Sequence, residues 1–576
     1  DGLPELVVAT ASGAVHVWSF ARGEADELAG FPFVTAADGE PRGPAYGSTS
    51  GINPDLLRES VATIPAIGDV DGDGAPDLVV ASRRGQLYVV NVEGELRPGW
   101  PRRLPDAEEP CIDGCPGQPR YLPRDLLASP VLAELDPSPG LEILVAGFDG
   151  RVHALHGDGT AVGGWPVTLI APEELLDFGP FAPPTVADFT GDGVPDLVIG
   201  AERTDRELAQ FFLVDGRGSA ASSALLDDWP VELTSWSLLR GVGAGARAVS
   251  AAGDFDDDGL PDVVLQGNAL PPFILPAAPG EQAGPDVPPE NALPLRDPRT
   301  GARGIEYTGR FGADATADAS SPMAPLLSAP VLGDLDQDGT LDVVATGATL
   351  SVANRLLNGG VGDGAATYLV AFWSGRSGEM LPGSPAAIEG LTWLGGAAVA
   401  DLTGDSYPEI VFGTEGSLVH AIDACGREAQ GWPKRTGQWV AAAPAIGDFD
   451  GDGRLEVAVV TRAGWVHLWR TDAPADAVSP WPTQRRDPTN TGSMTTALPE
   501  RPARGDAPPL PVDAEGHCLP EAVPETPAPP APDLVPRGGC DCASAPGRRA
   551  PRGAAWALLL AAIAAAGARR RRTGAS

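Results

Sequence analysis

The sequence predicts an all-β protein built from a small sheet unit that repeats along the chain. Three observations predict this class. A short acidic motif returns at intervals over most of the 576 residues. Apolar and polar residues then alternate as in a β-strand. The 73 glycines and 60 prolines are too many for long helices to dominate, while a hydrophobic content of 43% is enough for a packed core.

The first element of the pattern is the acidic motif. Its copies differ in spacing but keep their internal order, which indicates a constant unit joined by loops of variable length. Full copies begin at Ile67, Val186, Ala252, Leu332, Val399 and Ile446, and a weaker copy begins at Leu132. Residues 1–8 (DGLPELVV) match the second half of the motif, so we expect that the natural protein extends further at this end.

The strands around the motif come next. A segment of small residues leads into the acidic loop, a β-branched run follows it, and a glycine turn leads to an alternating strand. Such strands are expected at 15–18, 152–155, 419–422 and 466–469. Many units end in a Trp-Pro step, which belongs at a sheet edge or a turn because proline cannot donate to a ladder. These steps begin at Trp100, Trp165, Trp229, Trp432 and Trp481.

Units of this size cannot bury both faces of their sheet alone. Stacking them radially lets neighbours cover one another, so the repeats predict a β-propeller over residues 1–493. The pattern leaves seven and eight blades open. Pro-rich insertions at 102–127 and 270–320 are expected to be variable surface loops.

The acidic loop has the ligand pattern of a calcium site. In the copy at Asp69, carboxylates occupy positions 1, 3, 5 and 9, with Gly74 at position 6 for a sharp turn. Calcium takes six to eight oxygen ligands from such a loop. An EF-hand places a helix after the loop, whereas here the run Leu78-Val79-Val80 indicates a strand.

Six copies are predicted to bind calcium as a structural ion that fastens each blade. Their ligands are Asp69, Asp71, Asp73 and Asp77; Asp188, Thr190, Asp192 and Asp196; Asp254, Asp256, Asp258 and Asp262; Asp334, Asp336, Asp338 and Asp342; Asp401, Thr403, Asp405 and Glu409; and Asp448, Asp450, Asp452 and Glu456. Ser406 replaces the glycine in the Asp401 copy. The copy at Glu134 has Asp136, Ser138 and Glu142 with Pro139 in the glycine position, and it is not expected to bind metal.

Plain Asp-Gly hairpin turns are the competing interpretation of these loops. A turn does not require acids at positions 1, 3 and 9, and clustered carboxylates repel one another without a cation. No basic residue recurs at a fixed distance from the motif to neutralise them. The pattern therefore favours metal.

These repeats resemble the FG-GAP/VCBS type found in integrin-α-like propellers. The resemblance covers residues 1–493, and the segment WPTQRRDPTNTG at 481–492 is similar to the closing segment of such proteins. It implies a propeller that binds calcium.

The C-terminal part differs in composition. Residues 494–538 are rich in Pro, Ala and Glu and predict an extended, disordered stalk. An apolar run at 553–568, followed by Arg569 to Arg572, predicts a membrane-inserted helix whose arginine end faces the cytoplasm. Residues 539–572, with Cys540 and Cys542, resemble the myxobacterial sorting tail MYXO-CTERM. That resemblance implies export, processing near Cys540 and attachment at the cell surface or outer membrane.

The cysteines leave pairing open. Cys111 and Cys115 could close a small disulfide loop, with zinc as the alternative, and Cys425 and Cys518 could pair or stay free.

Charge and motif content narrow the function. A formal net charge of -38 argues against nucleic acid as a partner. His16, His153, His420 and His467 share one strand position, which indicates packing rather than catalysis. The leading hypothesis is a non-enzymatic, exported, surface-anchored calcium-binding module that contacts a protein or glycan. A propeller enzyme (polysaccharide-acting or quinone-dependent) and a passive surface-layer spacer are the alternatives.

Overall fold

A computed structural model describes residues 2–37, 58–104, 128–203, 208–234, 249–267, 271–281, 289–296, 323–324, 328–349, 368–392, 396–498, 505 and 507–519, apart from isolated positions. The predicted insertions 102–127 and 270–320 are described only in part, and residues 102–103, 273–275 and 293–294 in them form strands rather than loops. Residues 105–127, with Cys111 and Cys115, and 297–320 lie outside the described residues, as do most of the predicted stalk and the whole segment 539–576. No helix among the described residues is long and apolar enough to cross a membrane, and the run 553–568 is not one of them.

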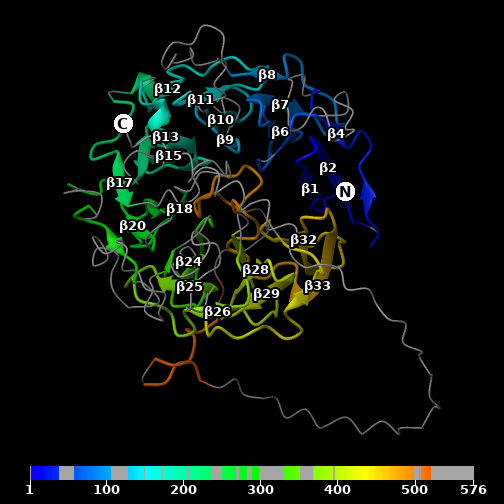
Figure 1. Ribbon diagram of the computed structural model, residues 1–576, viewed down its shortest axis with the longest axis vertical. Coiled ribbons are helices and arrows are strands. Elements are labelled where there is room, and N and C mark those ends of the chain that lie inside the picture. Colours follow the sequence, from blue (N-terminus) through cyan, green and yellow to red (C-terminus); the bar gives the residue numbers. More distant parts are fainter. Residues whose placement is uncertain are drawn as a thin grey trace, which may run out of the picture.

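The described strands form eight antiparallel sheets arranged as the blades of a ring (Figure 1). The predicted all-β propeller is confirmed, and the number of blades is eight. We number the blades in chain order. In blades 2, 3, 5 and 7 four strands follow one another outward in sequence order. Blades 4 and 6 each have a fifth strand, and blade 8 has three in the described residues.

The first four blades have the following strands. Blade 1 has β1 (Leu6–Ala9), β2 (Ala14–Ser19), β3 (Asp26–Glu27) and β4 (Phe33–Val34); blade 2 has β5 (Ala66–Gly68), β6 (Asp77–Ala81), β7 (Gln86–Val90) and β8 (Arg102–Arg103); blade 3 has β9 (Val131–Ala133), β10 (Glu142–Ala146), β11 (Arg151–Leu155) and β12 (Val167–Thr168); and blade 4 has β13 (Phe178–Phe181), β14 (Thr185–Ala187), β15 (Asp196–Arg203), β16 (Leu208–Val214) and β17 (Val231–Thr234), with short 3-10 turns η2 (Leu175–Asp177) and η3 (Gly218–Ala220).

The other four blades complete the ring. Blade 5 has β18 (Val249–Gly253), β19 (Asp262–Gln266), β20 (Phe273–Leu275) and β21 (Leu293–Pro294); blade 6 has β22 (Met323–Ala324), β23 (Val331–Gly333), β24 (Asp342–Thr349), β25 (Tyr368–Ser374) and β26 (Ala386–Ile388); blade 7 has β27 (Ala397–Ala400), β28 (Glu409–Gly413), β29 (Leu418–Ile422) and β30 (Lys434–Arg435); and blade 8 has β31 (Ala445–Gly447), β32 (Arg454–Val460) and β33 (Val466–Pro474).

The core lies between the blades rather than within one of them. Buried apolar side chains of neighbouring sheets pack face to face, and the largest such cluster joins blades 5, 6 and 7 around Trp373 and Trp481. Phe20 of blade 1 meets Phe449 of blade 8 edge to face, which closes the ring. Burial of this kind contributes roughly 25 cal/mol per Å² of apolar surface.

Tryptophans of the predicted Trp-Pro steps also join neighbouring blades. The step at Trp481 follows β33 and lies outside the strands of the blades. In blades 2, 3, 4 and 7 the step lies just before the last strand, as expected for a residue that cannot donate to the ladder. Its indole then donates a hydrogen bond to a carbonyl of the next blade: Trp100 to Gly157 and Trp165 to Gly216. These bonds hold adjacent blades in register at their outer side.

Residues 480–494, which we call the hub segment, run along the axis of the ring (Figure 1, orange). The segment bonds in turn to inner strands of blades 7, 8, 2, 3, 4 and 5: Val399 donates to Trp481, Ile446 to Pro482, Ile67 to Pro488, Leu132 to Thr489, Val186 to Thr491 and Ala252 to Gly492. The predicted closing segment 481–492 therefore links the inner strands of six blades at the centre of the ring.

Buried polar side chains hold the hub segment in place. Arg485, 4% exposed, donates to carbonyls of Pro184 and Ser250 in blades 4 and 5. Asn490 donates to the carbonyls of Pro65 and Pro130 in blades 2 and 3. These bonds satisfy buried or part-buried backbone acceptors, and through them the hub segment links blades far apart in sequence.

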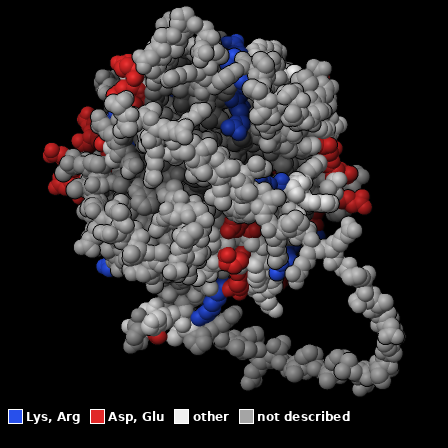
Figure 2. Space-filling model, viewed as in Figure 1, with Lys and Arg blue, Asp and Glu red and all other residues white. Residues whose placement is uncertain are grey.

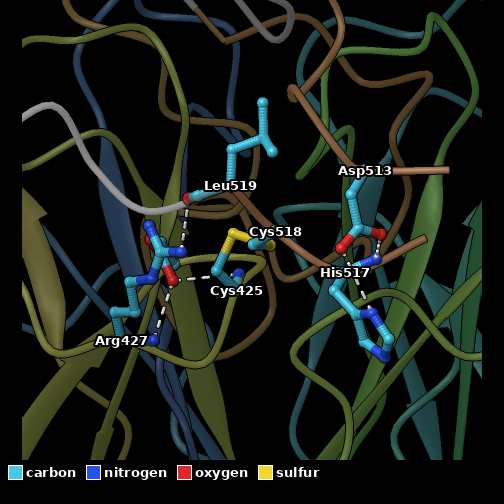
Figure 3. Close-up of a disulfide and its surroundings, with 7 residues drawn as sticks. Cys425, Arg427, Asp513, His517, Cys518 and Leu519 are labelled. Carbon is cyan, nitrogen blue, oxygen red and sulfur yellow. Dashed lines mark hydrogen bonds and ion pairs between the residues drawn. A yellow bond between two sulfur atoms is a disulfide. The ribbon is translucent and has the colours of Figure 1, made fainter. Parts of the chain in front are cut away.

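Part of the predicted stalk lies against the ring. Residues 507–519, the strap, are tied to blade 7 by a disulfide between Cys425 and Cys518 (Figure 3). Arg427 donates to the carbonyl of Leu519. At the other end of the strap, Leu510 donates its N–H to the carbonyl of Asp336 in blade 6.

Candidate metal centres

The acidic loops occupy the same place in seven blades. In blades 2 to 8 each loop joins the strand nearest the axis to its neighbour, as β5 is joined to β6. The residue just before position 1 faces the acid at position 9 across the ladder: Gly68 faces Asp77, and Gly253 faces Asp262. The register therefore fixes both ends of the loop. We name each loop after its first acid.

Backbone hydrogen bonds fold the loop around the acid at position 1. The Asp69 carboxylate accepts the N–H groups of Gly72 and Gly74 at 2.7 and 2.8 Å. Both glycines have left-handed backbones, with φ of 75° and 87°, where other residues are strained. The motif predicts the turn at position 6 but not the one at position 4. There the Asp254 and Asp334 loops tolerate Asp257 and Gln337 at φ of 61° and 58°.

The remaining acids cap the loop in the same way. Positions 3 and 5 accept the N–H two residues on, as Asp256 does from Asp258 and Asp258 does from Leu260. Position 9 accepts the N–H of position 2, as Asp262 does from Phe255 at 3.1 Å. These bonds use one oxygen of each carboxylate and point the acids toward a common centre.

Four of the predicted loops bring acids from positions 1, 3 and 9 within 4.8 Å of one another: Asp69, Asp71 and Asp77; Asp254, Asp256 and Asp262; Asp334, Asp336 and Asp342; and Asp448, Asp450 and Glu456. The Asp188 and Asp401 loops do not form such a group of acids. Each has a threonine at position 3, Thr190 or Thr403. Their other predicted ligands are the acids at positions 5 and 9 of the loops: Asp192, Asp196, Asp405 and Glu409.

Burial makes the position 9 acids costly to ionise. Burial and then the neighbouring carboxylates raise the pKa of Asp262 to about 7. For Asp196, burial and the nearby Asp215 raise the pKa to about 6. The pKa values of Asp342 and Glu409 lie well above the usual range, mainly through burial. A cation at the loop centre would reverse this effect, because it favours the charged carboxylate.

The clearest sign of a missing ligand is one buried carboxylate oxygen, in Asp342. Asp342 is fully buried, and its Oδ2 accepts the N–H of Leu335 at 2.8 Å. Its Oδ1 has no hydrogen-bond partner. The Oδ1 of Asp254, the Oδ2 of Asp77 and the Oε1 of Glu456 likewise have no hydrogen-bond partner. Buried polar atoms are nearly always paired, so each such oxygen indicates a missing ligand.

Other loops receive a basic side chain, although no basic residue recurs at a fixed distance from the motif. Arg97, between β7 and β8, contacts Asp71, Asp73 and Asp77 at 2.8, 2.9 and 2.7 Å. Arg470 of β33 reaches Asp450 and Asp452 in blade 8. Arg217 contacts Asp192 at 2.6 Å in blade 4. The arginines lie at different distances from the motif along the sequence, so a search for a fixed offset could not find them.

The weak copy in blade 3 also has a basic partner. His156 lies 3.4 Å from Glu142 and 3.8 Å from Asp136, and the Ser138 hydroxyl contacts both the histidine and Glu142. The position of His156 directly after β11 brings it to the loop centre.

The four repeated histidines lie within the blades. His153 is 3% exposed and bonds to Asp149, whereas His420 is stacked on Phe412 and bonds to Glu389 and Glu428. A cavity of about 690 Å³ lies beside the hub segment between blades 8, 1 and 2. Its wall is mostly apolar, and the charged groups of Arg486 and Asp487 there already bond within the hub segment.

No protein-family model matches the chain, and no curated protein matches it significantly. Solved structures similar to this chain include BamB from Moraxella catarrhalis (12% identity, TM-score 0.40, covering 81% of this chain and 93% of that one) and Sqt1 of Saccharomyces cerevisiae (9%, 0.44, 82% and 93%). A Bacillus licheniformis rhamnogalacturonan lyase is a third (15%, 0.36, 80% and 80%). Likenesses this weak carry no argument about activity or partner, and the eight blades stand on the sheets themselves.

Proposed function

We propose that the acidic loops bind calcium as a structural ion, within an exported surface module that acts by binding a protein or glycan. The observation that carries the metal part is Asp342. A fully buried carboxylate with one unpaired oxygen, in a group with two further acids within 4.8 Å, requires a cation for its charged form.

The ligand chemistry favours calcium over other metals. The loop centres of blades 2, 5, 6 and 8 are lined by carboxylates, with no cysteine or histidine in these groups of described residues. Hard oxygen donors suit calcium and magnesium, whereas zinc prefers nitrogen and sulfur. A flexible loop with four acids supplies the larger coordination number of calcium.

The position of the loops suggests what the ion does. Each loop connects the axial strand to its neighbour, so an ion at its centre would fasten the inner edge of a blade. At ten times Kd, one site contributes about 1.4 kcal/mol by linkage. Six such sites would contribute roughly 8 kcal/mol, comparable with the stability of a whole domain.

Calcium binding can be measured directly on the full chain by calorimetry and terbium luminescence. Asp342→Asn should remove one tight site, because the asparagine is neutral and loses a ligand oxygen. Asp472→Asn, at a side chain that is 89% exposed outside the loop centre, is the charge-matched control and should leave binding unchanged. Absence of calcium binding by the wild-type chain at millimolar concentration would refute the proposal.

Two features support the exported binding module. A Cys425–Cys518 disulfide is typical of proteins in oxidising compartments, where calcium is also abundant. The hub segment fills the axis with side chains that bond to the protein itself, which favours binding through surface loops over catalysis in a central channel. On the face that Figure 2 shows, acidic side chains appear at several separate places rather than in one patch.

The partner can be sought with glycan and surface-protein screens in calcium, repeated in chelator. We expect binding of one class that is lost with calcium. Turnover of a polysaccharide would instead favour the enzyme, and no binding at all would favour the passive spacer.

A further inference from the structure

The strongest unexplained feature is the arginine at the centre of the Asp69 loop. Arg97 uses three different nitrogens on three different carboxylates: Nη1 on Asp71, Nη2 on Asp73 and Nε on Asp77. These are the acids at positions 3, 5 and 9. The Arg97 side chain is 18% exposed, and Asp77 is fully buried.

A guanidinium can do part of the work of a metal here. It is permanently charged, and its planar fork of N–H donors matches several carboxylate oxygens at once. It also engages three of the four predicted ligands, so calcium can bind with full coordination only after Arg97 leaves. The two cations therefore exclude each other.

Blade 8 repeats the arrangement from a different strand. Arg470 in β33 contacts Asp450 and Asp452, and it lies 3.7 Å from Glu456 at position 9. Its side chain is 54% exposed, so its hold on the loop is weaker than that of Arg97. In contrast, no ion pair from a described basic residue reaches Asp254, Asp256, Asp258 or Asp262 of blade 5.

We propose that Arg97, and more weakly Arg470, are built-in counterions that compete with calcium, so that the acidic loops form two classes. The inference rests on the proposed calcium function. Loops of the first class, in blades 2 and 8, are held closed by arginine when calcium is scarce. The Asp254 loop belongs to the second class and depends on the metal.

The place of the first class in the ring gives this division a purpose. Blades 2 and 8 are the two neighbours of blade 1, where the ring closes. The Asp448 loop also touches blade 1 directly, because Gly451 packs on Leu3. An arginine in each flanking loop keeps the closure intact without metal, while the Asp254 loop of blade 5 can respond to calcium.

The test uses the full chain and calcium itself, with Arg97→Gln as the variant. Glutamine removes the charge and the fork, so the Asp69 loop should bind an additional calcium ion, or bind one at least about tenfold more tightly, which corresponds to about 1.4 kcal/mol. Combining Arg97→Gln with Asp71→Asn should abolish the gain, which assigns it to this loop. Arg83→Gln, an exposed arginine of the same blade, is the matched control and should leave the titration unchanged.

The outcomes distinguish failure of the arginine inference from failure of the proposed calcium binding. Equal calcium titrations of wild type and Arg97→Gln, with calcium bound by both, would overturn the inference and leave the proposed function standing. Absence of calcium binding in all variants would overturn both. If Arg97→Gln does not fold, Arg470→Gln tests the same idea at a more exposed side chain, and an unchanged calcium titration of that variant would equally overturn the inference.

Discussion

The Asp69 loop of blade 2 and the Asp254 loop of blade 5 share the same motif in different electrostatic states. Both have aspartates at positions 1, 3, 5 and 9, glycine at position 6, and the same ladder register. In blade 2 Arg97 pairs with three of the acids, whereas in blade 5 no ion pair from a described basic residue reaches Asp254, Asp256, Asp258 or Asp262. The repeat motif therefore fixes the positions of the acids but not the group that neutralises their charge.

The strap extends the comparison to blades 6 and 7, and its loss should give the largest effect. It contacts Asp336 and Tyr407 within the Asp334 and Asp401 loops, through Leu510 and Pro508. Cys518→Ser removes a disulfide that spans 93 residues, so we expect a loss of about 3 kcal/mol in unfolding free energy. Denaturant unfolding in calcium measures it.

The control for this experiment is wild type in reductant, which should match Cys518→Ser. Calcium affinity at the Asp69 and Asp254 loops should not change, because the described strap does not contact them. A loss below 0.5 kcal/mol, on the order of a neutral surface substitution, would show that the strap is not held by its disulfide.

The role of Arg97 in the Asp69 loop can be tested by substituting Asp77. Asp77→Asn removes the buried partner of Arg97 and should cost about 2 kcal/mol in chelator. The loss falls below that of a fully buried pair because Arg97 is partly exposed and keeps Asp71 and Asp73. Thermal or denaturant unfolding in chelator measures it, and an unchanged stability would contradict the role of Arg97.

For the Asp254 loop of blade 5, the effect of a substitution on unfolding free energy should instead change sign between chelator and calcium. Asp262→Asn removes a buried charge that no described basic residue compensates, so in chelator the chain should be unaffected or slightly more stable. In calcium at ten times Kd the variant loses a ligand, and stability should fall by about 1.4 kcal/mol relative to wild type. Unfolding curves of both proteins in both conditions are needed. The same sign in chelator and calcium would remove the distinction between the two loops.

The fold and the loop positions could be predicted because they depend on short stretches of sequence. Alternation marks the strands, and the acids at positions 1, 3, 5 and 9 mark a turn whose ends the ladder then fixes, as Gly68 and Asp77 show. Eight blades could not be chosen over seven, because the first unit matched only part of the motif.

The partners of the loops could not be predicted because they come from elsewhere in the chain. Arg97 reaches its loop from the segment between β7 and β8, and Arg470 reaches its loop from β33, at different sequence distances from the motif. His156 enters a loop that has no glycine at position 6. The hub segment was visible as a motif at 481–492, but its bonds to blades 2 to 5, 7 and 8 depend on closure of the whole ring.

The most direct test is hydrogen–deuterium exchange of the full chain with and without calcium, compared between residues 69–81 and 254–266. Amide exchange reports local opening of each blade. We expect calcium to slow exchange strongly at 254–266 and only slightly at 69–81, which Arg97 already holds. No change at either segment would contradict calcium as the structural ion, and an equal change at both would contradict the two classes of loop.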